Sequence, residues 1–310
     1  MNATAESSLT HTPAPPALPV PAAAPKLPNP DELPLTVIDG RASWSWGDVL
    51  EIVRFRELFW QFTLRDIKIR YKQTILGLGW SFFQPITTIL MFVIFIGWIG
   101  KAAEGMDRWN YVLFVVAGVL PWTFFNSALM NAGISFVNNE QLVSKVYFPR
   151  LALPLSNVFA AVFDWLVCMA LFAVIMACVG FVPPWQIVFA PFIMGLMILL
   201  ASSFGIFFSA LIAEQRDFRY LLQFGMQLWM FATPGIYLQA NKIPDAAYPW
   251  IQLNPVQGIV TNFRSCVLGP EAGGPFDFVG LGIAIGITML VTVVGLIYFR
   301  RVDRTIADRI

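Results

Sequence analysis

The chain has 310 residues, of which 57% are hydrophobic and only 13% are charged. Because soluble domains carry about 25% charged residues, this composition excludes an ordinary soluble protein and indicates a chain that crosses a membrane several times. The formal net charge of +1 decides nothing about partners by itself, and no nucleic-acid partner is expected.

Two segments precede the first long apolar run. Residues 1–40 contain nine prolines among many alanines, and we expect them to form a disordered tail. Residues 47–72 predict an amphipathic helix along the membrane surface, because basic and apolar side chains recur on separate faces at steps of three and four. Its apolar stripe comprises Trp60, Leu64, Ile67 and Tyr71, and its assigned basic residues are Arg54, Arg65, Lys68, Arg70 and Lys72.

Six apolar segments follow, and crossing a bilayer takes about 20 apolar residues. The fourth begins after the two prolines of GFVPPWQ at 180–186, which interrupt a charge-free run too long for one helix. The sequence therefore predicts an all-α membrane protein with six transmembrane helices within residues 78–300 and a C-terminal tail at 301–310. The six expected spans are 78–100, 111–134, 153–179, 186–212, 220–235 and 278–299.

The distribution of lysine and arginine predicts the orientation, because basic loops stay on the cytoplasmic side. With both termini in the cytoplasm, sixteen of the twenty basic residues lie inside. The four that lie outside are Lys101, Arg108, Lys242 and Arg264.

Asp164 is the only acidic residue within an expected span. A charge at that depth costs at least roughly 2.5 kcal/mol, so we expect Asp164 to pair within the bundle or to be neutral. A proton relay would suit a secondary transporter, but a single carboxylate without further ionisable groups favours a structural role.

The inner loop between the second and third spans predicts a short amphipathic helix at 138–148, which Asn138 or Asn139 can cap and Pro149 ends. Two interpretations are open: a helix that docks in a groove of a partner, or a linker on the membrane surface. The residues assigned to docking are Asn139, Glu140, Leu142, Lys145, Val146 and Tyr147.

The last outer loop, residues 238–277, contains Pro244, Pro249 and Pro255 but keeps apolar pieces such as AAYPWIQL. Short helices that dip back into the membrane would explain this pattern, since such backbone is tolerated where it is buried in protein. The alternative is a loop that rests on the outer surface.

No residue cluster indicates catalysis or metal binding, since histidine is confined to His11 and no carboxylates pair in a plausible site. A phosphate-binding loop is also absent: Gly100 and Lys101 are adjacent, but Phe95 and Ala102 replace the required glycine and hydroxyl residue. Nucleotide hydrolysis is therefore expected on another chain.

Three blocks resemble the membrane subunit of ABC-type polysaccharide exporters, which move O-antigen, capsular glycan or teichoic acid across the inner membrane. They are RDIKIRYKQTILGLGWSFFQP at 65–85, SKVYFPRLALPL at 144–155, and TPGIYL through LNPVQGIVTNFR at 233–264. The resemblance covers residues 47–310.

This resemblance implies a subunit of the bacterial inner membrane that acts as a homodimer in contact with membrane lipids. Two cytoplasmic ATPase subunits would bind ATP and magnesium, and this chain would bind no cofactor. The helix at 48–72 would be the interface helix, residues 139–147 the coupling helix that contacts the ATPase, and the loop at 238–277 the outer gate. The implied substrate is a lipid-linked polysaccharide.

A glycan pathway needs aromatic platforms and hydrogen-bonding groups, because a sugar has an apolar face and a rim of hydroxyls. The alternative for such residues is ordinary packing in the core or against lipid. The candidates are Trp80, Phe83 and Thr87 on the first span, Trp122, Phe125 and Asn126 on the second, and Trp229, Thr233 and Tyr237 on the fifth.

Three other functions remain open. An exporter of a smaller substrate, such as a drug or a lipid, would use the same scaffold, although the aromatic density favours glycan. An integral membrane enzyme acting on a lipid carrier would need convergent acids, bases or a metal site near one interface. A proton-coupled secondary transporter would show inverted repeats and several intramembrane charges.

Overall fold

The computed structural model describes residues 55–72, 79–101, 103–145, 148–239, 242–244 and 246–309. Every regular element within these ranges is helical, which confirms the all-α prediction for this part of the chain. The described residues all belong to the second of two units into which the chain divides, Trp44–Ile310. The expected tail at 1–40 and Arg54 lie outside the described residues, and the fold below is that of the second unit.

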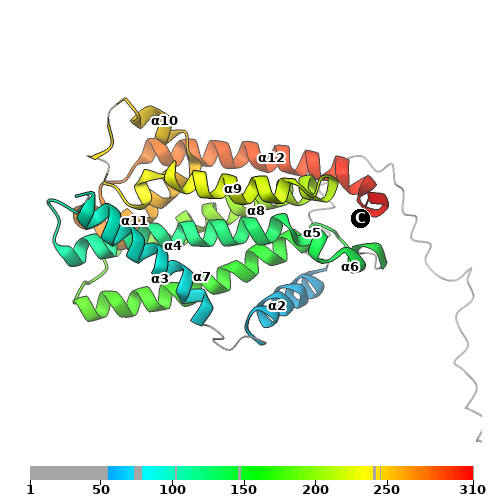
Figure 1. The fold of residues 1–310 in the computed structure, drawn as a ribbon, viewed down its shortest axis with the longest axis horizontal. Helices are drawn as coiled ribbons and strands as arrows, with labels where there is room; N and C mark the ends of the chain where they lie inside the picture. Colours follow the sequence, from blue (N-terminus) through cyan, green and yellow to red (C-terminus); the bar gives the residue numbers. More distant parts are fainter. Residues whose placement is uncertain are drawn as a thin grey trace, which may run out of the picture. The chain divides into compact units, whose positions relative to one another are not determined.

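Four long apolar helices form the bundle (Figure 1), and each is long and apolar enough to cross a membrane. Helix α4 lies in its interior, with nearly every side chain from Tyr111 to Phe125 buried, as expected for a helix that is apolar all round. The outer helices instead expose many apolar side chains, as a lipid-facing surface requires. The four helices are α4 Arg108–Gly133, α7 Ala152–Val179, α8 Ala190–Glu214 and α12 Phe278–Arg309.

The expected first and fifth spans differ from single long helices. The first is α3 Gly79–Met91, followed by the π-helical segment η2 Phe92–Ile99. The fifth, α9 Phe218–Phe231, has 14 residues and is therefore about 21 Å long, short of the roughly 30 Å of the hydrocarbon layer. It ends before Pro234, which has no backbone N–H to continue the helix.

The connecting segments gather at two opposite ends of the bundle, named here the α6 end and the α10 end (Figure 1). At the α6 end, Arg150 pairs with Asp303 at 3.0 Å and Arg216 pairs with Glu140 at 3.7 Å. At the α10 end, the Lys242 ammonium donates to the Glu104 carbonyl at 2.8 Å. Successive loops thus alternate between the two ends.

The last loop before α12 is mostly helical. The short η4 Pro234–Ile236 follows α9, and α10 Tyr248–Gln252 precedes α11 Pro255–Gly273. Helix α11 packs against α4, α8 and α12 and is buried over almost its whole length. It bends at Gly269, whose φ is 76°, just before Pro270.

One expected helix boundary is wrong. The helix expected at 138–148 is two short helices, α5 Ser135–Asn138 and α6 Glu140–Lys145, separated at Asn139; the chain is no longer helical at Phe148 and Pro149. The segment expected as a C-terminal tail at 301–310 is helical as far as Arg309, as the last part of α12, and Phe299 and Val302 are buried against the bundle.

Candidate functional site

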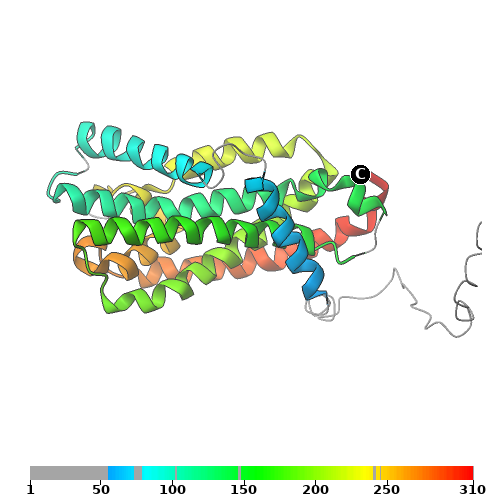
Figure 2. The same ribbon diagram turned by 90° about the horizontal axis from the view of Figure 1, so that it is seen from below.

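The interface helix predicted at 47–72 is described as α2 Arg56–Lys72, which lies across α7 (Figure 2). Its contact face is made of aromatic rings: Phe59 meets Phe159 edge-on at 5.2 Å, and Phe62 meets Phe148 at 5.5 Å. Of the expected apolar stripe, Trp60 is 56% exposed, whereas the Tyr71 ring packs against Phe163 of α7. The aromatic rings of Phe59, Phe62 and Tyr71 therefore attach α2 to the bundle.

Asp164 on α7 is bound by α2. The Arg70 guanidinium pairs with one carboxylate oxygen and the Tyr71 hydroxyl donates to the other. The Tyr71 ring also packs edge-on against Phe163, with centroids 6.1 Å apart. The sequence predicted that Asp164 pairs within the bundle or is neutral. Its partners come from α2 instead: Arg70, one of the assigned basic residues, and Tyr71, a member of the expected apolar stripe.

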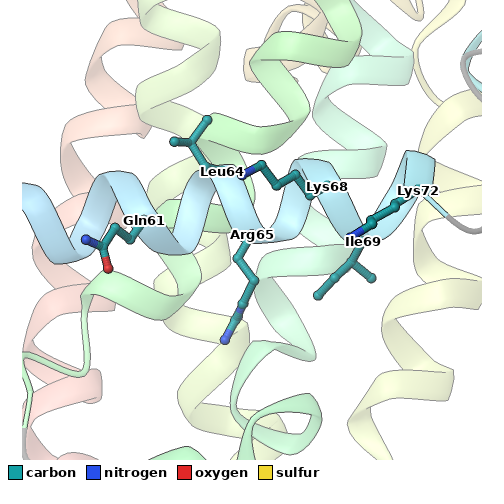
Figure 3. Close-up of a pocket in the computed structure, with 6 residues that line it drawn as sticks. All are labelled: Gln61, Leu64, Arg65, Lys68, Ile69 and Lys72. Atoms are coloured by element: carbon teal, nitrogen blue, oxygen red, sulfur yellow. The ribbon is translucent and has the colours of Figure 1, made fainter.

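The basic face of α2 is turned away from these contacts. Figure 3 shows the groove that runs along it, where long basic side chains lie beside apolar ones. Lys68 and Lys72 are exposed, whereas Arg65 pairs with its neighbour Asp66 at 2.8 Å. The residues that line the groove are Gln61, Leu64, Arg65, Lys68, Ile69 and Lys72.

A compact hydrophobic cluster at the α6 end joins α2 to the two short helices. Phe62 from α2, Phe136 from α5 and Phe299 from α12 are all buried in it, and the rings of Phe136 and Phe299 are 5.8 Å apart. Val143 of α6 is also buried there, and Leu142 packs against its edge. The cluster therefore connects α6 with α2 and α12 through closely packed side chains.

The predicted docking residues differ in the contacts that they make. The Asn139 amide donates to the Ser135 carbonyl at 2.8 Å, while the Asn139 carbonyl accepts from the Leu142 amide at 2.9 Å, so this residue links α5 to α6. Glu140 is paired with Arg216 across the loop that precedes α9. Lys145 closes α6. The predicted roles of Val146 and Tyr147 lie outside the described residues.

The candidate pathway residues fall into two groups. Phe83 and Thr87 on α3 are exposed, whereas Trp122, Phe125, Thr233 and Tyr237 are buried inside the chain and Asn126 is partly buried. The Trp229 ring packs edge-on against Phe125 at 5.3 Å and against Phe204 at 5.4 Å. The side chain of Trp80 lies outside the described part. Within one copy of the chain, core packing thus accounts for the buried group.

An exposed apolar stripe on α9 consists of residues that were not among the sequence-predicted candidates. Helices α3 and α9 lie on the same side of the bundle (Figures 1 and 2). The helical spacing of the exposed apolar residues on α9 could have identified this surface from the sequence, since these residues form one stripe. They are Tyr220, Leu221, Phe224, Leu228 and Phe231.

Asn254, which precedes α11, was also missed. Its side-chain oxygen accepts from the Trp229 indole N–H at 3.0 Å, and its amide donates to the Thr233 hydroxyl at 2.8 Å. Two of the predicted pathway residues therefore use their polar atoms inside the chain. Within the described ranges, no group of three or more histidine, cysteine, aspartate or glutamate side chains could hold a metal ion.

Comparison with known proteins identifies similar chains. The family model described as "ABC-2 type transporter" matches residues 57–268. Two O-antigen export system permease proteins RfbA from Klebsiella pneumoniae are 29% and 28% identical over 248 and 251 residues, each covering 79% of this chain and 92% of the relative. A protein of the same name from Myxococcus xanthus is 25% identical over 218 residues, which is 70% of this chain and 82% of the relative.

Proposed function

The chain belongs to the ABC-2 type transporter family, and we propose that it is the membrane subunit of an ATP-driven exporter of a lipid-linked polysaccharide of the O-antigen kind, in the bacterial inner membrane. The similarity to three O-antigen export permeases over 70% to 79% of the chain carries this proposal. Hydrolysis of ATP takes place on two copies of a separate cytoplasmic ATPase subunit, and this chain supplies the pathway.

The proposed topology has six crossings, with the α6 end in the cytoplasm. The four long helices supply four crossings, and α3 with η2 and α9 supply the others. Because α9 is too short to cross the hydrocarbon layer alone, η4 and the buried α11 fill the remaining depth of that layer at the α10 end. The alternation of loops between the two ends supports this topology, as does the concentration of basic residues in the loops assigned to the cytoplasm.

The ATPase subunit contacts α6, and its movement reaches the spans through α2. The hydrophobic cluster of Phe62, Phe136 and Phe299 supports this route, because it contains side chains from α2, α5 and α12. The attachment of α2 to Asp164 also supports this route, since a displacement of α2 would displace α7 through the contacts of Arg70 and Tyr71 with Asp164.

Two copies of the chain face each other through α3 and α9, and the glycan passes between them. The stripe from Tyr220 to Phe231 on α9 is exposed in one copy, as is Phe83 on α3. Aromatic side chains are enriched at protein interfaces and offer flat surfaces for sugar rings. The exposed group of candidates is therefore the part of the predicted pathway that a glycan can reach.

Two measurements on a deletion strain test this function: the amount of polysaccharide on the cell surface and the amount of lipid-linked polymer inside the cell. Deletion of the gene is expected to abolish surface polysaccharide and to leave lipid-linked polymer inside the cell, and a plasmid copy restores export. An exporter of a drug or of a small lipid would leave surface polysaccharide unchanged, which would contradict the proposed substrate.

The docking surface is tested by reversing a charge at each end of the bundle. Glu140→Lys places a cation opposite Arg216 on the proposed ATPase face, and we expect it to reduce co-purification of the ATPase and export at least about tenfold. The control Glu271→Lys makes the same change on an exposed residue of α11 and is expected to have little effect. Equal ATPase recovery with both variants would rule out docking at α6.

A further inference from the structure

The outer end of α9 is attached to the beginning of α11 by the side chain of Asn254. Besides Trp229 and Thr233, this side chain contacts two backbone groups: its amide donates to the Ala232 carbonyl at 3.2 Å, and its oxygen accepts from the Val256 amide at 3.1 Å. An asparagine side chain has two N–H donors and one oxygen with two lone pairs. All four positions are therefore used.

A second attachment lies one turn further on, at Gly235 in η4. The Gly235 amide donates to the Gln257 side-chain oxygen at 2.8 Å, and its carbonyl accepts from the Arg264 guanidinium. The approach is close, because a Cβ atom at Gly235 would lie 2.4 Å from the Gln257 amide nitrogen and would displace that side chain. The segments TPGIYL and LNPVQGIVTNFR thus bind each other.

Arg264 extends this attachment to α4. It is only 2% exposed, donates to the Gly273 carbonyl at 3.0 Å, and lies 3.6 Å above the ring of Phe114 on α4. In addition, the Tyr111 hydroxyl of α4 donates to the Tyr237 carbonyl at 3.1 Å. The outer half of α4 is therefore joined to the same group of residues.

Separating α9 and η4 from α11 would break the contacts of Asn254 with Trp229, Ala232 and Thr233 and those of Gly235 with Gln257 and Arg264 together. Buried donors and acceptors that lose their partners pay the full cost of desolvation, and the buried Arg264 charge would keep the Gly273 carbonyl of its own helix but lose that of Gly235. Gly269, at the other end of α11, has a φ of 76° and precedes a proline, so a change of direction is already present outside the attached part.

We infer that residues 229–237 and 254–264 move as one rigid unit during transport, with Asn254, Gln257 and Arg264 as positioning residues. The inference rests on the proposed export function and sharpens it. The outer gate opens by displacement between the two copies of the chain, or in the segment around α10, while α11 stays on α9.

A reversible cross-link separates this inference from a gate in which α11 swings away. The three cysteines, Cys168, Cys178 and Cys266, are first replaced by alanine, and Thr233→Cys with Asn254→Cys is introduced where the native side chains are 2.8 Å apart. We expect oxidation to form a disulfide between the two new cysteines. The oxidised protein should export at no less than about half of the rate of the cysteine-free chain that has Thr233 and Asn254. Reduction of the same sample serves as the control for folding.

Loss of export on oxidation, recovered on reduction, would overturn the inference, and so would failure of the pair to cross-link. If the wild-type chain itself did not export polysaccharide, that result would instead count against the proposed function, while cross-linking still reports on the contact.

A second pair of variants removes or retains the Thr233 hydroxyl, which accepts from the Asn254 amide and donates to the Trp229 carbonyl. Thr233→Val removes the hydroxyl that accepts from Asn254, and Thr233→Ser retains it. We expect Thr233→Val to reduce export several-fold and Thr233→Ser to stay within about twofold of the wild type. Asn131→Ala is a matched control, because its amide bonds only within α4, to Ser127. Equal export by the valine and serine variants would contradict a positioning role.

Discussion

The carboxylate of Asp164 is bound by two side chains of α2, the Arg70 guanidinium and the Tyr71 hydroxyl. The Arg70 and Asp164 side chains are 23% and 20% exposed, so the pair lies between a surface ion pair and a buried one. The contribution of this ion pair to stability should also lie between that of a surface pair and that of a buried pair, because water screens half-buried charges only in part. A structural role for Asp164 follows, as the attachment point of the interface helix.

Asp164→Ala is expected to destabilise the protein by more than the about 1 kcal/mol of an exposed pair and less than the about 3–5 kcal/mol lost when a buried pair is broken. The measurement is the apparent Tm in detergent, compared with Arg70→Ala and with the double variant. The control is Arg65→Ala, which removes a pair with Asp66 inside the same helix and should cost at most about 1 kcal/mol. Strictly additive effects of the two single variants would show that the pair does not form.

At the scale of elements, the bundle depends on close approaches that only glycine permits. A Cβ atom at Gly258 of α11 would lie 2.3 Å from the carbonyl oxygen of Gly280 on α12. A Cβ atom at Gly118 of α4 would lie 2.4 Å from the carbonyl oxygen of Ile236. Small residues let helix backbones approach closely in membranes, where no hydrophobic effect drives helices together.

Gly258→Ala should therefore force α11 and α12 apart and cost about 1–3 kcal/mol, the usual range for overpacking. Gly195→Ala on α8 is the control, because its Cβ atom would meet nothing within 4 Å, and alanine favours a helix over glycine by about 1 kcal/mol. Apparent Tm values in the same detergent compare the two. A Gly258→Ala protein as stable as the control would refute the close packing of α11 on α12.

At the scale of the whole molecule, the six-crossing topology predicts which residues a reagent reaches from each side. In a background without cysteine, Val182→Cys, 83% exposed at the α10 end, should react with an impermeant maleimide added to intact spheroplasts. Gln141→Cys on α6 should react only after the membrane is permeabilised. Labelling of both sites from the outside would refute the six-crossing arrangement.

Hydropathy predicted the four long helices well, since each is a continuous apolar segment: the expected 111–134 compares with α4 Arg108–Gly133, and 153–179 with α7 Ala152–Val179. The first and fifth spans were less predictable. Apolar composition gives no information on the π-helical turn at Phe92–Ile99, or on the early end of α9, where the chain turns back toward α11. At the proposed site, the attachments of Trp229 and Thr233 to Asn254 could not be predicted, because no periodicity connects them.

The sequence by itself determined that this is a helical membrane protein and that it resembles polysaccharide-export permeases, because span composition and motif blocks are properties of short segments. Only the tertiary structure decided which polar groups meet. Arg70 and Asp164 are 94 positions apart, and Trp229 and Asn254 are 25 apart. Such pairs depend on how helices cross and which faces they bury, and a buried polar group takes whichever partner the packing brings within reach.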